Sequence, residues 1–241
     1  MTINSFIRQR KGTIHAHELE ALAWLQVLSQ PEREHALNDL YIFDVQSGET
    51  FCGIGRPVTH WFGVVEGLLK VSSDSAEGQT MTFVGVPPGG WFGEGTALKR
   101  EAYRYNIQAL RKSRVAGVHV DTFHWLLDHS IGFNRFVMNQ LNQRLGQFIA
   151  GREIDRMTDP DIRVARSLAA LMNPVLYPGF YKVLHITQQE LAYLVGLSRQ
   201  RVNEALTVLA ACGAIAVEYG GLRVLNLQAL RTQTVFSLQS L

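Results

Sequence analysis

Residues 187–206, TQQELAYLVGLSRQRVNEAL, place basic side chains and an amide directly behind a serine. Arg199 and Gln200 each carry a flat, forked group. Arg can bond guanine O6 and N7 at once, and Gln can bond adenine N6 and N7 in the same way. Ser198 is suited to cap a helix whose first N–H groups also fit a phosphate. The spacing therefore favours a helix that begins after Ser198 and presents its first turns to the major groove of DNA.

A preceding helix must hold this helix in position on the domain. Residues 187–196 carry the sequence signals for the start and the end of such a helix. Thr187 and Glu190 have the three-residue spacing of a capping box, so we expect a helix to begin at Gln188. Gly196 stands where a chain can leave a helix with positive φ. Only a few residues then join the two helices, as in a helix-turn-helix. The candidate DNA contacts of this unit are Thr187, Ser198, Arg199, Gln200, Arg201, Asn203 and Glu204.

The stretch AIAVEYGGLRVLNL, which follows the two helices, predicts a hairpin that turns at Gly220–Gly221. It lies at a suitable distance to form a wing beside the helix-turn-helix, with Arg223 as a candidate contact to the DNA backbone. For an isolated SRQR run, a solvated helix face is the better interpretation. The surrounding pattern favours DNA, although a helix-turn-helix that serves only protein contacts is a further alternative.

The region from about 40 to 120 consists of short apolar runs separated by turn residues. The runs YIFDV, LLKVSS, TMTFVGV and VAGVHV are rich in β-branched and aromatic residues, which predicts an antiparallel β-roll or sandwich of short strands. Before them, HELEALAWLQVL has apolar residues at helical spacing and predicts one amphipathic helix.

A long helical pattern follows the β-region, and its apolar stripe needs a partner. Four side chains spaced three, four and three apart form a coiled-coil seam, which favours a two-fold homodimer; packing on the β-domain is the alternative, best suited to the first turns near Trp125 and Leu126. Asp159 and Pro160 then start another helix. We expect an α+β protein with a β-roll over 1–120, a long dimerisation helix and hinge over 121–158, and a winged helix-turn-helix over 159–241. The seam residues are Met138, Leu141, Leu145 and Phe148.

Length and composition exclude several classes of protein. The chain has 241 residues, of which 46% are apolar, enough for a sizeable core. No apolar run approaches the roughly 20 residues that cross a bilayer, and MTINSFIRQRKGTI lacks the apolar stretch of a secretion signal. We therefore expect a cytoplasmic protein with no membrane partner. The net charge of +2 provides no global basic field, so DNA binding must rest on a local patch.

A β-roll, a long helix and a winged helix-turn-helix, in this order, resemble the cyclic-AMP receptor/fumarate-nitrate regulator (CRP/FNR) family of bacterial transcription factors. The most specific part is ITQQELAYLVGLSRQRVNEALTVLAACGAI. The resemblance implies a homodimer that binds double-stranded DNA, with RNA polymerase as a further partner. It also implies that bases are read chiefly by Arg199, Gln200 and either Asn203 or Glu204.

The sensor half resembles the family's phosphate-binding cassette in PGGWFGEGTALKREAYRYNIQAL. Gly93–Glu94 match the pair that approaches the ribose in cyclic-nucleotide binders, whereas Tyr103–Arg104 stand where those binders have an Arg-Ser pair. The resemblance thus implies a small effector of unidentified chemistry, with a cyclic nucleotide as the alternative. No cofactor is evident. With only Cys52 and Cys212, the chain cannot form the cysteine cluster of the iron–sulfur branch.

The remaining ligand-type residues do not favour a haem or a metal site. Haem needs an axial ligand such as His or Cys; His60, His119 and Cys52 lie in strand-like runs, where ordinary packing explains them better. A cupin-like metalloenzyme is a rival for a β-roll, and His15 and His17 with Glu18 and Glu20 superficially resemble its ligand set. Those residues precede the strands, in a predicted helix where side chains two apart diverge. No metal site and no enzyme are expected.

Overall fold

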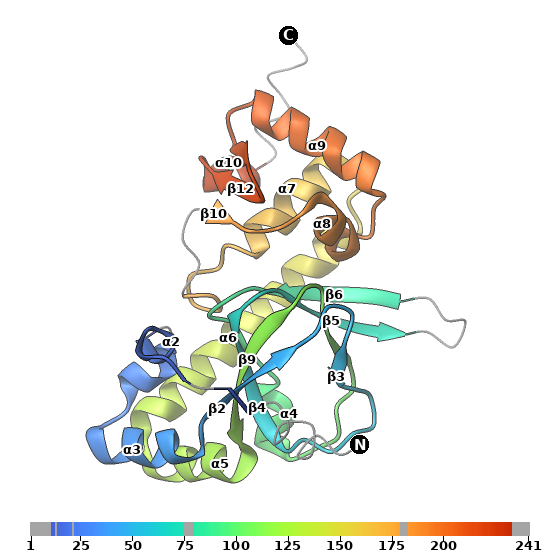
Figure 1. The fold of residues 1–241 in the computed structure, drawn as a ribbon. Coiled ribbons are helices and arrows are strands. Elements are labelled where there is room, and N and C mark those ends of the chain that lie inside the picture. Colours follow the sequence, from blue (N-terminus) through green and yellow to red (C-terminus); the bar gives the residue numbers. More distant parts are fainter. Residues whose placement is uncertain (1–10, 13, 21, 75–79, 179–182, 233–241) are drawn as a thin grey trace.

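Two antiparallel sheets face each other in the N-terminal half, and a smaller helical unit lies at the far end of a long helix (Figure 1). The structure is a computed structural model that describes residues 11–12, 14–20, 22–74, 80–178 and 183–232. The larger sheet has the order β1-β2-β9-β4-β7 and the smaller one β3-β8-β5-β6. The strands are β1 (Lys11–Gly12), β2 (Tyr41–Val45), β3 (Thr50–Cys52), β4 (His60–Glu66), β5 (Leu69–Asp74), β6 (Thr80–Val86), β7 (Trp91–Phe92), β8 (Asn106–Ala109) and β9 (Ser113–His119).

The predicted β-roll is confirmed, but the helix predicted before it is wrong as a single element. The chain instead forms α2 (Ala16–Glu20) and a 3₁₀ turn, η1 (Ala23–Val27), followed by α3 (Gln30–Asp39). Glu18 bonds to Arg114 of β9, while Trp24 is fully buried in the core. The chain therefore forms two short elements, α2 with the Glu18 ion pair and η1 with the buried Trp24, in place of one helix.

Aromatic packing forms the centre of the β-roll. The rings of Trp24, Trp61 and Trp91 lie with centroids 4.1 to 5.5 Å apart, and Phe133 meets Trp24 edge-on at 5.9 Å. Such edge-to-face contacts add to the stabilisation from burial. Phe133 is in the first turn of α6, so the start of the long helix is anchored in the core of the β-roll, as is Leu126 before it.

The helical pattern after residue 120 is divided at Ser130 into α5 (Val120–His129) and α6 (Ile131–Asp155), which corrects the prediction of one long helix over 121–158. The Ser130 hydroxyl accepts the N–H of Phe133 at 3.2 Å and donates to Glu32 at 3.1 Å. Ser130 therefore caps α6 while it holds the junction against α3. Small α4 (Glu94–Lys99) lies between β7 and β8.

The C-terminal unit has its own core, formed by three main helices and a small sheet. Asp159 caps α7 as predicted, accepting the N–H of Asp161 at 2.8 Å, and the wing is a sheet of order β10-β12-β11. Among the described residues, no helix has the length and apolar character needed to span a membrane. The elements are α7 (Pro160–Ala170), β10 (Val183–Leu184), α8 (Gln188–Val195), α9 (Arg199–Ala211), β11 (Ile215–Glu218), β12 (Gly221–Val224) and α10 (Leu227–Arg231).

Candidate DNA-reading helix and effector pocket

The start of α8 has the predicted capping box. The Thr187 N–H donates to a Glu190 carboxylate oxygen at 2.8 Å, and the Glu190 N–H donates to the Thr187 hydroxyl at 3.2 Å. Gly196 ends the helix at φ 66°, a backbone conformation that a side chain disfavours. The turn into α9 is thus fixed by local chemistry.

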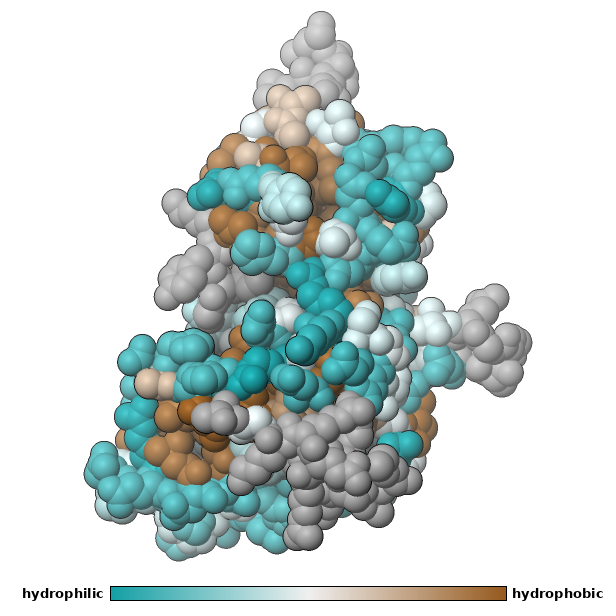
Figure 2. All heavy atoms as spheres, in the orientation of Figure 1, coloured by the Kyte–Doolittle hydropathy of each residue, from teal (hydrophilic) through white to brown (hydrophobic). Residues whose placement is uncertain are grey.

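Ser198 caps α9 by accepting the N–H of Arg201 at 3.2 Å. One face of α9 is buried through Val202, Ala205 and neighbouring apolar side chains, which fixes the helix on the domain. The opposite edge is exposed and begins with Arg199 and Gln200. Figure 2 shows hydrophilic residues gathered over the α8–α9 end of the domain, at the right of that view.

Most of the predicted contact residues on this edge already have partners. The Gln200 amide donates to Glu204 at 3.2 Å, and Asn203 accepts from Gln188 at 2.6 Å. In the part of the chain that the structure describes, Arg199 has no ion-pair partner. It is therefore the side chain most available to a base.

Arg201 behaves differently from its neighbour Arg199. Its guanidinium turns back to Asp161 at the start of α7, and a second nitrogen lies 3.6 Å from Glu204. The ion pair of Arg201 with Asp161 thus connects α9 to α7. The roles of Asp161 and Gln188 could not be predicted from local sequence, because their partners Arg201 and Asn203 lie 40 and 15 residues away.

The wing carries Arg223 on an exposed strand position beside Glu218. The hydrogen bond and the charge of Glu218 raise the pKa of Arg223. Tyr219, at the tip, is fully exposed. To bind a phosphate from this position, the Arg223 guanidinium must either break its hydrogen bond to Glu218 or use its remaining N–H groups.

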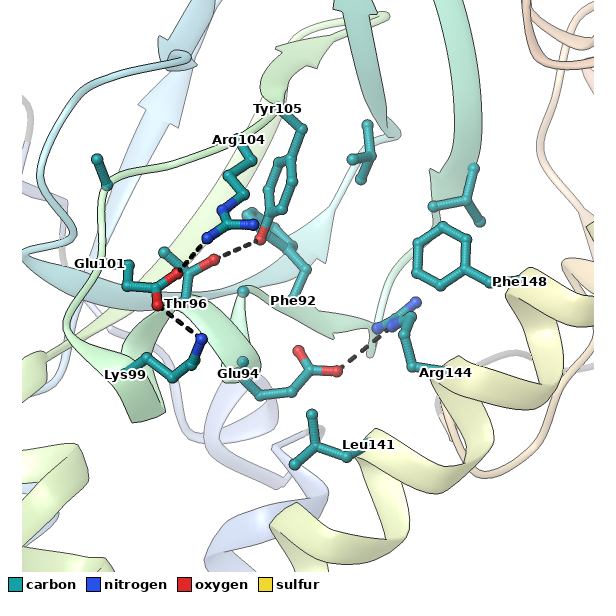
Figure 3. A pocket seen from close by; sticks show the side chains of 15 residues that line it. Phe92, Glu94, Thr96, Lys99, Glu101, Arg104, Tyr105, Leu141, Arg144 and Phe148 are labelled. Carbon is teal, nitrogen blue, oxygen red and sulfur yellow. Dashed lines mark hydrogen bonds and ion pairs between the residues drawn. The ribbon is translucent and has the colours of Figure 1, made fainter.

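A second candidate site is a cavity of about 360 Å³ between the β-roll and α6. Figure 3 shows side chains from α4, the strands and α6 converging on it. Gly93, at φ 82°, lets the chain turn into α4 so that Glu94 enters the cavity. Its apolar walls are Val71, Val84, Phe92, Leu141 and Phe148.

Glu94 is buried and faces a cation that sequence reasoning missed. Arg144 of α6 lies 3.4 Å from the Glu94 carboxylate and donates to the Trp91 carbonyl at 2.6 Å. The Arg144 side chain is only 11% exposed. Arg144 thereby joins the long helix to the floor of the cavity.

The rim of the cavity carries the other charges. Glu101 lies between Lys99 at 2.6 Å and Arg104 at 3.2 Å, and the Tyr105 hydroxyl is 3.2 Å from that of Thr96. The hydrogen bond and the charge of Lys99, aided by Arg104, lower the pKa of Glu101. An anionic group at the rim would compete with Glu101 for these two cations.

Of the predicted effector pair Tyr103–Arg104, Arg104 lines the cavity and Tyr103 does not. Tyr103 is buried in the core, where its hydroxyl donates to the His60 carbonyl at 3.2 Å, and burial raises its pKa. In the segment 103–105, Arg104 and Tyr105 are the residues that line the cavity. These residues precede β8, and the chain bends at residues 104–105, so Arg104 and Tyr105 both face the cavity while Tyr103 does not.

The residues considered for haem or metal have other roles in the structure. Burial, with a contribution from His119, lowers the pKa of His60 to about 3, and burial raises the pKa of the Cys52 thiol. The rings of His15 and His17 stack at 5.7 Å and do not diverge, because His15 precedes the first residue of α2. Over the described residues, no three His, Cys, Asp or Glu side chains are grouped to hold a metal ion.

Comparisons with known proteins agree with this geometry. Residues 42–130 match the cyclic nucleotide-binding domain, and residues 162–233 match the Crp-like helix-turn-helix domain. The transcriptional regulator SdrP of Thermus thermophilus is 30% identical over 183 residues, which are 74% of this chain and 86% of SdrP. The chain belongs to the CRP/FNR family.

A second relative and a solved structure are also similar to this chain. A CRP-like cAMP-activated global transcriptional regulator of Mycobacterium tuberculosis is 26% identical over 216 residues, covering 88% of this chain and 91% of that protein. The structure of FixK2 from Bradyrhizobium japonicum has a TM-score of 0.65 at 18% identity, covering 80% of this chain and 96% of FixK2, and shows the same fold. The protein is a DNA-binding transcription regulator of the CRP/FNR type.

Proposed function

We propose that this CRP/FNR regulator is a homodimer that reads a pseudo-palindromic operator and responds to a small molecule in the β-roll cavity. The observation that carries the proposal is the exposed position of Arg199 and Gln200 at the start of a capped, well-anchored helix. Because bacterial DNA lies in the cytoplasm, the protein acts there. RNA polymerase is a further partner on the strength of the family resemblance alone.

The apolar stripe on α6 supports the homodimer. Met138 and Leu145 are seven residues apart and each 60% exposed, and Phe148 and Ile149 continue the stripe. A second copy of the same stripe would cover these side chains, as in a coiled coil. Leu141 contributes less than its seam position suggests, because it also packs against the β-roll core.

In this dimer, two α9 helices enter successive major grooves about 34 Å apart. Arg199 reads guanine, Gln200 and Glu204 act as one hydrogen-bonded pair, and Asn203 acts together with Gln188. Thr187, Ser198 and Arg223 contact the phosphates.

The cavity supports an effector with an apolar body and an anionic group. Its walls are apolar, and Lys99 and Arg104 at the rim offer positive charge once Glu101 is displaced. A cyclic nucleotide is the second candidate, favoured by the cAMP-activated relative. Against it, the resemblance implies a small serine in cyclic-nucleotide binders at the position that the larger Arg104 occupies here.

Selection of bound DNA from a random pool tests the operator proposal. We expect enrichment of inverted repeats with half-site centres about 10 base pairs apart, and binding that weakens steeply as salt rises. Enrichment of single half-sites only, or of no sequence, would contradict it. Calorimetry with cyclic AMP and cyclic GMP, using Arg104→Ala as the control, tests the second candidate; heat that Arg104→Ala leaves unchanged argues against binding in this cavity.

A further inference from the structure

Each half of the chain contributes side chains to the hydrophobic core of the other half. Leu68, in the turn between β4 and β5, is buried in the core of the C-terminal unit, and Leu110 packs against the same core. In return, Leu176 and Tyr177, which follow α7, are buried in the core of the β-roll. This reciprocal packing places α8 directly beside β6 (Figure 1).

Contact between α8 and the sheet is close. A methyl group added to Gly85 of β6 would lie 2.7 Å from a Leu194 methyl carbon, so Leu194 would have to shift to make room for it. The Lys70 ammonium of β5 lies 5.8 Å from the centre of the Tyr193 ring. The first helix of the helix-turn-helix, α8, therefore rests on the outer face of the β5–β6 pair.

The charged part of this contact is an ion pair between Arg111 and Glu190. Arg111 lies in the turn between β8 and β9 and donates from Nε to the Glu190 carboxylate at 2.7 Å, with a second N–H to the other oxygen. Glu190 is buried, and the same carboxylate accepts the N–H and the hydroxyl of Thr187. A planar guanidinium matches a carboxylate in this paired geometry and fixes its orientation.

We propose that Arg111, a residue of the sensor half, is a positioning residue for DNA reading. By gripping the carboxylate that caps α8, it fixes the α8–α9 pair on the β-roll while the edge at Arg199 stays exposed. In a dimer, two heads held this way are preorganised to engage both half-sites at once. This inference rests on the proposed homodimer.

The effector cavity and the docked helix share one strand. Val84 lines the cavity, and Gly85, the next residue, meets α8 on the opposite face. The Tyr177 hydroxyl donates to the Gly85 carbonyl at 3.2 Å and lies 3.3 Å from Arg144, the partner of Glu94. A molecule in the cavity would therefore contact β6, the strand against which Arg111 helps to hold α8.

Arg111→Ala tests the proposal on two DNA duplexes, the selected palindrome and a single half-site. We expect a loss of about tenfold in affinity for the palindrome and a change of less than about twofold for the half-site. Arg111→Lys should recover only part of the loss, because an ammonium lacks the fork. Lys112→Ala is the matched control: it removes an exposed cation from the same turn and should leave both affinities unchanged.

Two results with DNA would overturn the proposal. Equal weakening on both duplexes with a shallower salt dependence would make Arg111 a phosphate contact. A gain in palindrome affinity would mean that the docked state opposes reading.

Hydrogen exchange without DNA separates this proposal from the homodimer. Amides of residues 187–195 should exchange several-fold faster in Arg111→Ala than in Lys112→Ala, and unchanged exchange would overturn the role of Arg111. If the wild-type protein shows no preference for the palindrome over the half-site, the homodimer proposal fails, and the exchange rates still decide whether Arg111 holds α8.

Discussion

Arg144 and Glu94 form an ion pair, 3.4 Å apart, between the middle of α6 and the first residue of α4. Arg144 also donates to the Trp91 carbonyl and to the Tyr177 hydroxyl, so one guanidinium links the long helix, the cavity floor and the segment after α7. Burial alone would lower the pKa of Arg144, but its interactions with Tyr177 and Glu94 raise that pKa overall.

Removal of this guanidinium should destabilise the β-roll. Arg144→Met leaves the buried Glu94 carboxylate without its cation, and we expect a loss of about 3 kcal/mol in the free energy of unfolding. Glu94→Gln should cost less, because Arg144 keeps three other acceptors. Tryptophan fluorescence during urea unfolding measures this directly, since all four tryptophans precede α6. Equal losses for the two variants would contradict the assigned roles.

The buried imidazole of His60 should make stability depend on pH. Burial, then the charge of His119, lowers its pKa to about 3 in the folded state, against about 6.5 in the unfolded chain. Below about pH 6.5 the unfolded chain binds a proton that the folded state does not, so stability falls as pH falls towards 3.

Comparison with His60→Phe isolates this effect from other titrating groups. Between about pH 7 and pH 5 the wild-type protein should lose about 2 kcal/mol relative to His60→Phe. Parallel stability curves for the two proteins would show that His60 gains its proton in the folded state as readily as in the unfolded state.

Local signals made the DNA-reading unit predictable from sequence. The capping box at Thr187, the turn at Gly196 and the cap at Ser198 each act within a few residues, and all three are confirmed. The cavity was harder to predict, because its parts are distant in the chain: Arg144 is 50 residues from Glu94. The direction of Tyr103 could not be assigned from a strand pattern, because the chain bends at residues 104–105 before β8 begins.

The apolar stripe on α6 gives a prediction about assembly. Leu145→Asp should place a charge in the dimer interface and raise the dimer dissociation constant at least about a hundredfold, since a buried leucine contributes about 2 kcal/mol on each side. Leu145 is preferable to Leu141, which also packs against the β-roll. Asn139→Asp adds the same charge at an exposed position about 100° around the helix from Met138, off the stripe, and is the control. Sedimentation equilibrium that finds equal dimer stability in both variants would contradict the assignment of the stripe.

The two arginines at the start of α9 are the most direct test of DNA reading. Arg199 is exposed at the helix edge, whereas Arg201 is held by Asp161. Binding of wild-type, Arg199→Ala and Arg201→Ala proteins should be measured on the selected operator and on operators with each single base pair changed. We expect Arg199→Ala to lose about 1 to 3 kcal/mol and to become indifferent to one base pair, while Arg201→Ala keeps the wild-type order of preferences. If Arg199→Ala weakened binding equally on every sequence, Arg199 would contact phosphate, and base reading by the leading edge of α9 would be contradicted.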